Sequence, residues 1–173
     1  MAIDCPVPRE TVRCATGVVP AHPAGACAPS RYVPAETPVE VNVAEDVPMV
    51  AGHVDALGRA LTNVLLNAVE ASTPGVPVEV TVRRAALDGR SMVEVAVHDR
   101  GVGIPQSRLG RIWEPYVTHK PGGTGLGLAI VRQTLLAHDG VVSAESATGA
   151  GTTIRLFLPV GTPGSLEGAL HGD

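Results

Sequence analysis

Asn63, Asn67 and Glu70 are polar residues four and three positions apart in a stretch whose apolar residues repeat at helical intervals. On a helix this spacing places the three side chains along one stripe. Asparagine is about 0.6 kcal/mol worse than alanine inside a helix, so two of them in the middle of one call for an explanation. An amide oxygen is a suitable ligand for Mg²⁺ when phosphates supply further ligands, and Glu70 would orient the remaining waters. The alternative is an ordinary solvated helix face.

Asp99 follows an alternating apolar stretch and precedes Gly101 and Gly103. An ionised carboxylate only accepts hydrogen bonds, so it would pair with the exocyclic amine of adenine. The glycines let the backbone approach a flat ligand closely. A turn-forming aspartate at the end of a strand is the simpler alternative.

A glycine-rich segment leads into a second apolar helix, and it reads Gly122-Gly123-Thr124-Gly125-Leu126-Gly127-Leu128. Unpaired N–H groups at the start of a helix bind phosphates. No Lys-Ser or Lys-Thr follows the glycines, which excludes a P-loop. A loop of about twenty residues separates them from the preceding strand, which excludes a dinucleotide-binding fingerprint. A glycine-rich helix start that serves packing alone is the alternative.

Residues 111–120 connect the two glycine segments. Trp113 and Tyr116 would anchor this loop by their rings, and Lys120 would direct its charge at a phosphate. Such a segment is typical of a lid over a bound ligand.

The apolar pattern predicts the elements that must position these residues. Alternating valines predict a strand over 39–43 and two more over 78–82 and 93–97, the latter two joined by a hairpin at Asp88-Gly89. Helical periodicity predicts helices over about 55–72 and 123–138, and a final hairpin pairs 141–145 with 152–158. This order predicts an α+β fold, with one mixed and mostly antiparallel sheet that carries its helices on one face.

Composition limits the class of protein. The chain has 173 residues, enough for one domain with a core, and its aromatic content of 2% predicts a core of Val, Leu, Ile and Ala. A net charge of −4 argues against general binding to nucleic acid or anionic lipid. No apolar run approaches the ~20 residues of a membrane span. We expect a cytoplasmic chain, with a membrane-anchored longer protein still compatible.

The sequence also predicts where the ordered part of the chain begins and ends. Six prolines in the first 35 residues predict that 1–36 is a flexible arm or linker. The ordered domain would cover 37–160, and 161–173 would be a disordered tail. Cys5, Cys14 and Cys27 are expected to be unpaired thiols in a reducing compartment.

Four segments together resemble the catalytic ATP-binding domain of bacterial sensor histidine kinases, within the wider Hsp90, gyrase and MutL-like ATPase superfamily. Their order and spacing match the N, G1, F and G2 boxes of that family, which here are Asn63–Ala68, Asp99–Ile104, Trp113–Lys120 and Gly123–Leu128. The likeness covers residues 37–160 and implies a two-layer α/β sandwich of the Bergerat type. Trp113 and Tyr116 replace the usual phenylalanines, and Asp139 replaces a glycine.

The resemblance implies that ATP and Mg²⁺ are ligands. It implies that Asn67 binds Mg²⁺, that Asp99 binds the adenine amine and that Lys120 binds the phosphates, with Asn67, Lys120 and Glu70 as the catalytic residues. The other residues implied to contact ATP are Asn63, Gly101, Gly103, Ile104, Tyr116, Thr118, Gly123, Thr124, Gly125, Leu126, Gly127, Leu128 and Thr152.

The activity implied is transfer of the γ-phosphoryl group of ATP to a histidine on a separate dimerisation segment, in cis or in trans, with a response regulator receiver domain downstream. The proline-rich arm around His22 cannot form the helix that carries such a histidine. His138 precedes Asp139 but ends a helix, where the family has a structural histidine. The alternatives are a serine kinase of the anti-sigma type and a nucleotide-binding interaction module without phosphotransfer.

Overall fold

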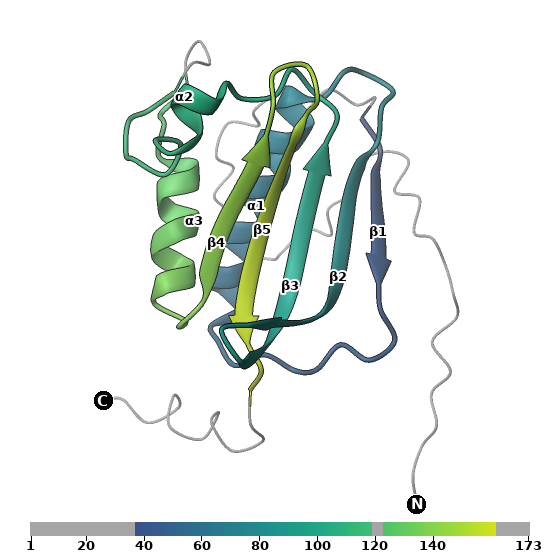
Figure 1. Ribbon diagram of the computed structural model, residues 1–173, viewed down its shortest axis with the longest axis vertical. Helices are drawn as coiled ribbons and strands as arrows, with labels where there is room; N and C mark the ends of the chain where they lie inside the picture. Colours follow the sequence, from purple (N-terminus) through teal and green to yellow (C-terminus); the bar gives the residue numbers. More distant parts are fainter. Residues whose placement is uncertain (1–36, 119–122, 162–173) are drawn as a thin grey trace, which may run out of the picture.

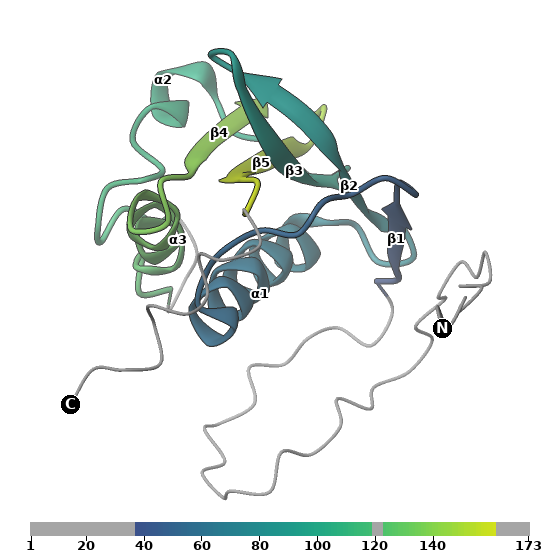
Figure 2. The same ribbon diagram turned by 90° about the horizontal axis from the view of Figure 1, so that it is seen from below.

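The computed structural model describes residues 37–118 and 123–161. Five strands form one mixed sheet, and the two long helices pack on one of its faces (Figures 1 and 2). The elements follow in the chain as β1 (Val39–Val43), α1 (Val54–Ala71), β2 (Val78–Leu87), β3 (Arg90–Asp99), α2 (Gln106–Leu109), α3 (Gly127–Leu136), β4 (Val141–Ser146) and β5 (Thr152–Pro159). The predicted α+β class is confirmed.

The strand order is β1-β2-β3-β5-β4, with β1 parallel to β2 and every other neighbour antiparallel. Val39 pairs with Val78 where β1 and β2 begin. Thr152, the first residue of β5, pairs with Asp99 at the end of β3 and with Ser146 at the end of β4. These strand ends therefore lie together at one end of the sheet, which we call the Asp99 end.

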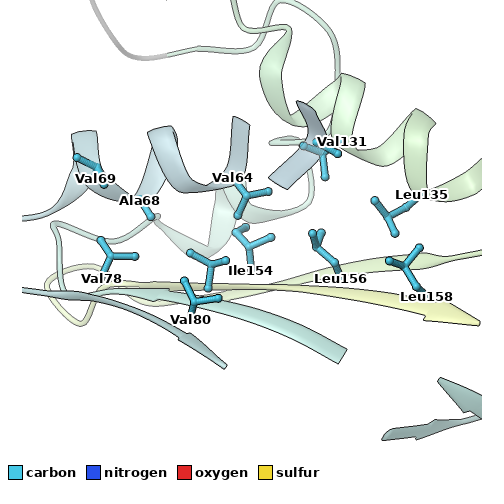
Figure 3. Close-up of a cluster of buried hydrophobic side chains, with 12 residues drawn as sticks. Val64, Ala68, Val69, Val78, Val80, Val131, Leu135, Ile154, Leu156 and Leu158 are labelled. Carbon is cyan, nitrogen blue, oxygen red and sulfur yellow. The ribbon is translucent and has the colours of Figure 1, made fainter. Parts of the chain in front are cut away.

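The core lies between the sheet and the two long helices (Figures 2 and 3). α1 buries Val64 and Ala68, and α3 buries Val131 and Leu135. The strands contribute every second residue, because alternate side chains point to the same face of a sheet. Burial of one such valine or leucine contributes about 1.5 to 3 kcal/mol relative to exposure. As the composition predicts, Val, Leu, Ile and Ala make up this core.

A row of alternating charges crosses the sheet on the face opposite the helices. Glu94 on β3 is only 2% exposed and pairs with Arg83 on β2 and with Arg155 on β5, the latter at 3.2 Å. Arg155 in turn reaches Glu145 on β4 at 2.8 Å. The hydrogen bond and the charge of Glu94 raise the pKa of the Arg83 guanidinium above its ordinary value. The buried carboxylate is thus compensated from both sides.

Three features of the chain after β3 differ from the sequence prediction. The second long helix begins at Gly127, not near residue 123, because Gly125 has a φ of 65°, outside the helical region. The same helix ends at Leu136 rather than at His138. The expected polar loop also contains the short helix α2, which is too short to show a hydrophobic period.

The end of α3 is built around Asp139 and His138. Asp139 has a φ of 52°, and the N–H of Gly140 donates to the carbonyl of Leu135 at 2.8 Å, which closes the helix. The His138 ring bonds the carbonyl of Thr134 through Nδ1 at 2.7 Å, and its Nε2 accepts the N–H of His53 at 3.0 Å. His138 therefore ties the end of α3 to the start of α1.

Several predictions concern residues outside the described ranges. They include the arm 1–36 with its three cysteines, Lys120 and the tail beyond Gly161. Within the described ranges, no helix is both long and apolar enough to cross a membrane.

Candidate functional site

α1 and α3 bring the asparagines of the N box against the glycine-rich helix start. A methyl group on Gly127 would lie 3.7 Å from Asn63 Oδ1 and 3.7 Å from Asn67 Nδ2. Both asparagines are half-buried, whereas Glu70, nearly a turn beyond Asn67, is exposed. Because α1 buries Val64 and Ala68 against the sheet, the asparagines occupy the flank that faces α3. Two segments sixty residues apart in the sequence thus share one surface.

Asp99 is buried at the end of β3, with 4% of its surface exposed. Its Oδ1 accepts the N–H of Gly101 at 2.9 Å and the N–H of Thr152 at 3.3 Å. Two backbone donors from different segments hold the carboxylate in one orientation. Such preorganisation is what recognition of a ligand amine requires.

The two glycines after Asp99 also have a packing role. A methyl group on Gly101 would lie 2.0 Å from the carbonyl oxygen of Ala71, at the end of α1. Gly103 has a φ of 69°, and a methyl group there would lie 1.9 Å from the carbonyl oxygen of Ala147. The loop 100–105 is therefore wedged between α1 and the β4–β5 turn, which requires glycine whether or not a base is bound.

Ser146, which no local sequence pattern singles out, connects two parts of the site. Its Oγ accepts the N–H of Ile104 at 2.7 Å, donates to the carbonyl of Gly151 at 2.7 Å and lies 3.0 Å from Thr152 Oγ1. The signal available in the sequence was the hairpin turn over 148–151, which sets residue 146 opposite residue 152. Ile104 and Thr152 thus lie beside Asp99 as a linked group.

The F-box segment meets the G2 segment through the backbone. The N–H of Tyr116 donates to the carbonyl of Gly125 at 3.0 Å. Tyr116 has a φ of 66°, which is rare for a residue other than glycine, and its side chain is 78% exposed. Trp113 is half-buried and packs against the hydrophobic core. Thr118 and Thr124 are exposed on either side of the segment 119–122, which includes Lys120 and lies outside the described residues.

α3 begins with Leu126 as its N-cap, so the N–H groups of its first turn have no partner within the helix. Leu128 packs against the core and fixes the start of the helix on the sheet. Gly123 and Leu126, on either side of Gly125, are half-buried. The helix start therefore faces the asparagines of α1, and the end of α1 lies against Gly101, two residues after Asp99.

Hollows elsewhere on the described surface lie away from these residues. One lies at the β2–β3 hairpin beside Arg83, Arg84 and Arg90, and another at the start of α1 beside His53 and Arg59. None of the site residues predicted from the sequence lines either of them.

Comparison with known proteins identifies the family of the chain. The family of histidine kinase-, DNA gyrase B- and HSP90-like ATPases matches residues 52–162. The chain belongs to this family.

Its relatives are sensor histidine kinases. The sensor histidine kinase ZraS of Klebsiella oxytoca is 42% identical over 106 residues, which are 61% of this chain and 22% of that protein. The chain therefore spans less than a quarter of this relative. A solved structure of the mycobacterial sensor histidine kinase MprB matches with a TM-score of 0.58 and 38% identity, and the match covers 70% of this chain and 80% of that one. Full-length ShkA in complex with AMPPNP matches with a TM-score of 0.60 and 31% identity, covering 72% of this chain and 26% of that one.

Proposed function

We propose that this chain binds ATP with Mg²⁺ and presents the γ-phosphoryl group to a histidine on a helical dimerisation segment, in cis or in a partner chain. The proximity of Gly127 to Asn63 and Asn67 carries the proposal, since it sets two side-chain amides beside a helix start that favours phosphate. Membership of the family and the likeness to sensor histidine kinases support it.

The phosphate side would be formed by α1, α3 and the segment between them. Asn67 is the proposed Mg²⁺ ligand, Asn63 supports it, and Glu70 would orient water bound to the metal. Lys120 would neutralise phosphate charge, and the N–H groups of the G2 box would hold the triphosphate. Tyr116, Thr118, Gly123, Thr124, Gly125, Leu126 and Leu128 are the other residues proposed to surround it.

The base side would be formed by the Asp99 end of the sheet. Asp99 would accept the adenine amine, because its carboxylate is buried and held by two backbone N–H groups. Gly101, Gly103, Ile104 and Thr152 would enclose the base. The donor set therefore fits an adenine nucleotide and a magnesium ion that takes few protein ligands.

Bound ATP supplies the phosphoryl group, and the chain supplies position and charge neutralisation. In the proposed transfer an imidazole nitrogen of the acceptor histidine bonds to the γ-phosphorus. The bond from that phosphorus to its bridging oxygen breaks, and ADP leaves. A receiver domain of a response regulator would take the phosphoryl group from the histidine, and the supply of ATP places this activity in the cytoplasm.

A transfer assay tests the proposal. The chain is incubated with Mg²⁺ and ATP labelled at the γ-phosphate, alone and fused to the histidine-bearing helical segment of a related sensor kinase. We expect label on the fusion protein, lost in acid as phosphohistidine is, and none on the isolated chain. A fusion whose acceptor histidine is replaced by alanine serves as the control.

Three results would contradict the proposal. Stable label on the isolated chain would show an acceptor within it, and acid-stable label on an added serine substrate would favour the serine kinase. Binding of ATP without transfer to any acceptor would favour the interaction module.

A further inference from the structure

Three polar side chains form a row across the Asp99 end of the sheet. Asp99 on β3 pairs with Thr152 on β5, which pairs with Ser146 on β4. Paired residues project to the same face of a sheet, and this is the face that carries the helices and the buried Val97 and Ile154. Asp99 and Thr152 are 4% and 6% exposed, so their hydrogen bonds are made within the protein or with a bound ligand.

The hydrogen bonds of Ser146 determine the direction of the next bond in the row. A hydroxyl has one hydrogen to donate and two lone pairs that accept. The hydrogen of Ser146 goes to the carbonyl of Gly151, which can only accept. One lone pair accepts the N–H of Ile104. In its 3.0 Å contact with Thr152, Ser146 therefore accepts, and the Thr152 hydroxyl donates.

We propose that Ser146 is a positioning residue that makes the site selective for a base with an amino group, such as adenine. Because the Thr152 hydrogen is directed at Ser146, Thr152 Oγ1 presents only lone pairs to a ligand. Asp99 beside it also presents acceptors. A purine with an amine at position 6 donates to this pair of acceptors, whereas hypoxanthine carries a carbonyl oxygen there and meets acceptor against acceptor. The inference rests on the proposed binding of ATP.

Ser146 also anchors the loop after β3 through the N–H of Ile104, so its removal has a second effect. A looser loop would weaken the binding of all purine nucleotides alike, because this effect does not depend on the group at position 6. The change in hydrogen-bond direction would act on adenine and hypoxanthine in opposite senses. The ratio of the two affinities therefore separates selectivity from mere support.

The test measures the Kd of ATP and of inosine triphosphate, with Mg²⁺, by calorimetry on the full chain. In Ser146→Ala the Thr152 hydroxyl loses its acceptor and is able to donate to the base carbonyl. We expect the Kd ratio of inosine triphosphate to ATP to fall at least about fivefold, which corresponds to the loss of a single hydrogen-bond preference. Ser143→Ala is the matched control, since it removes a hydroxyl from the same strand on the opposite face.

A double-mutant cycle covers the case in which Ser146→Ala is unstable. In a Thr152→Val background, which has no hydroxyl to direct, Ser146→Cys should leave the ratio unchanged, whereas in wild type it should lower it. An unchanged ratio in every Ser146 variant, with ATP still bound, would overturn the inference and leave the proposed function intact. Failure of the wild-type chain to bind ATP would overturn both.

Discussion

The backbone N–H of Tyr116 donates to the carbonyl of Gly125 at 3.0 Å, and both residues have a φ near 65°. This hydrogen bond joins the chain just before residue 117 to the chain just after residue 124. It therefore holds the F box and the G2 box together at this point. A methyl group on Gly125 would lie 2.6 Å from the carbonyl carbon of Tyr116. The two boxes can therefore meet in this way only if residue 125 is glycine.

Gly125→Ala should lower the affinity for ATP at least about tenfold, because the added methyl group forces the two boxes apart. Gly75→Ala is the matched control: Gly75 has a φ of 81° but no neighbour within 4 Å of an added methyl group. Both variants should lose about 1 to 2 kcal/mol of folding stability from the left-handed backbone. Urea denaturation measures the loss of stability, and ATP titration measures the loss of affinity. Equal ATP affinities in the two variants would contradict the claim that the approach of residues 116 and 125 shapes the site.

Asp99→Asn should keep the fold and weaken ATP binding about 10- to 100-fold. The amide oxygen of asparagine still accepts the N–H groups of Gly101 and Thr152, but its NH₂ group no longer accepts an amine. Trp113 is the single tryptophan of the chain, and its emission should report the titration. Unchanged ATP affinity in Asp99→Asn would show that this carboxylate does not bind the base.

Glu94→Gln should destabilise the fold by about 1 to 3 kcal/mol, since it replaces the buried carboxylate that pairs with Arg155 by an uncharged amide. Glu145→Gln removes the outer partner of the same arginine, and its side chain is 72% exposed. That loss should stay below about 1 kcal/mol. Urea denaturation compares the two, and ATP affinity should be unchanged in both because the row lies on the face opposite the helices. Equal stability losses would contradict the importance of burial here.

Asp139→Gly should stabilise the fold by about 0.5 to 1 kcal/mol, because glycine adopts the left-handed conformation without strain and carries no negative charge at the end of α3. Asp139→Asn removes only the charge and should give a smaller gain. Thermal unfolding of the three chains measures the difference. A glycine variant no more stable than the asparagine variant would show that the backbone at residue 139 is not strained.

Local patterns predicted most of the fold. The valines of β2 and β3 and the Asp88-Gly89 turn were sufficient for the central hairpin, in which both turn residues have positive φ. The predicted strands, 78–82 and 93–97, were too short. Backbone pairing continues to Leu87 and Arg90, beyond the point where apolar alternation stops. Alternation reports burial, whereas a ladder of hydrogen bonds persists where both faces are exposed.

The candidate site was predicted from residue types, from their spacing and from the family resemblance. Asn67, Asp99 and Gly127 were identified from their types and spacing, whereas Ser146 was missed. The three hydrogen bonds of Ser146 go to Ile104, Gly151 and Thr152, and the bond to Ile104 spans 42 positions of the chain. Strand pairing determines such contacts, and no local period in the sequence encodes them.

The parallel pairing of β1 with β2 has a mechanical consequence. Val39 lies level with Val78, and Val78 lies level with Asp99 because Glu79 pairs with His98. The chain that leads into Thr37 therefore joins the sheet two strand spacings, or about 10 Å, from Asp99. Gly161 leaves from the opposite end, beside Met49. A pull transmitted through the upstream residues acts first where the nucleotide is proposed to bind, whereas the same pull from downstream must cross the length of the sheet.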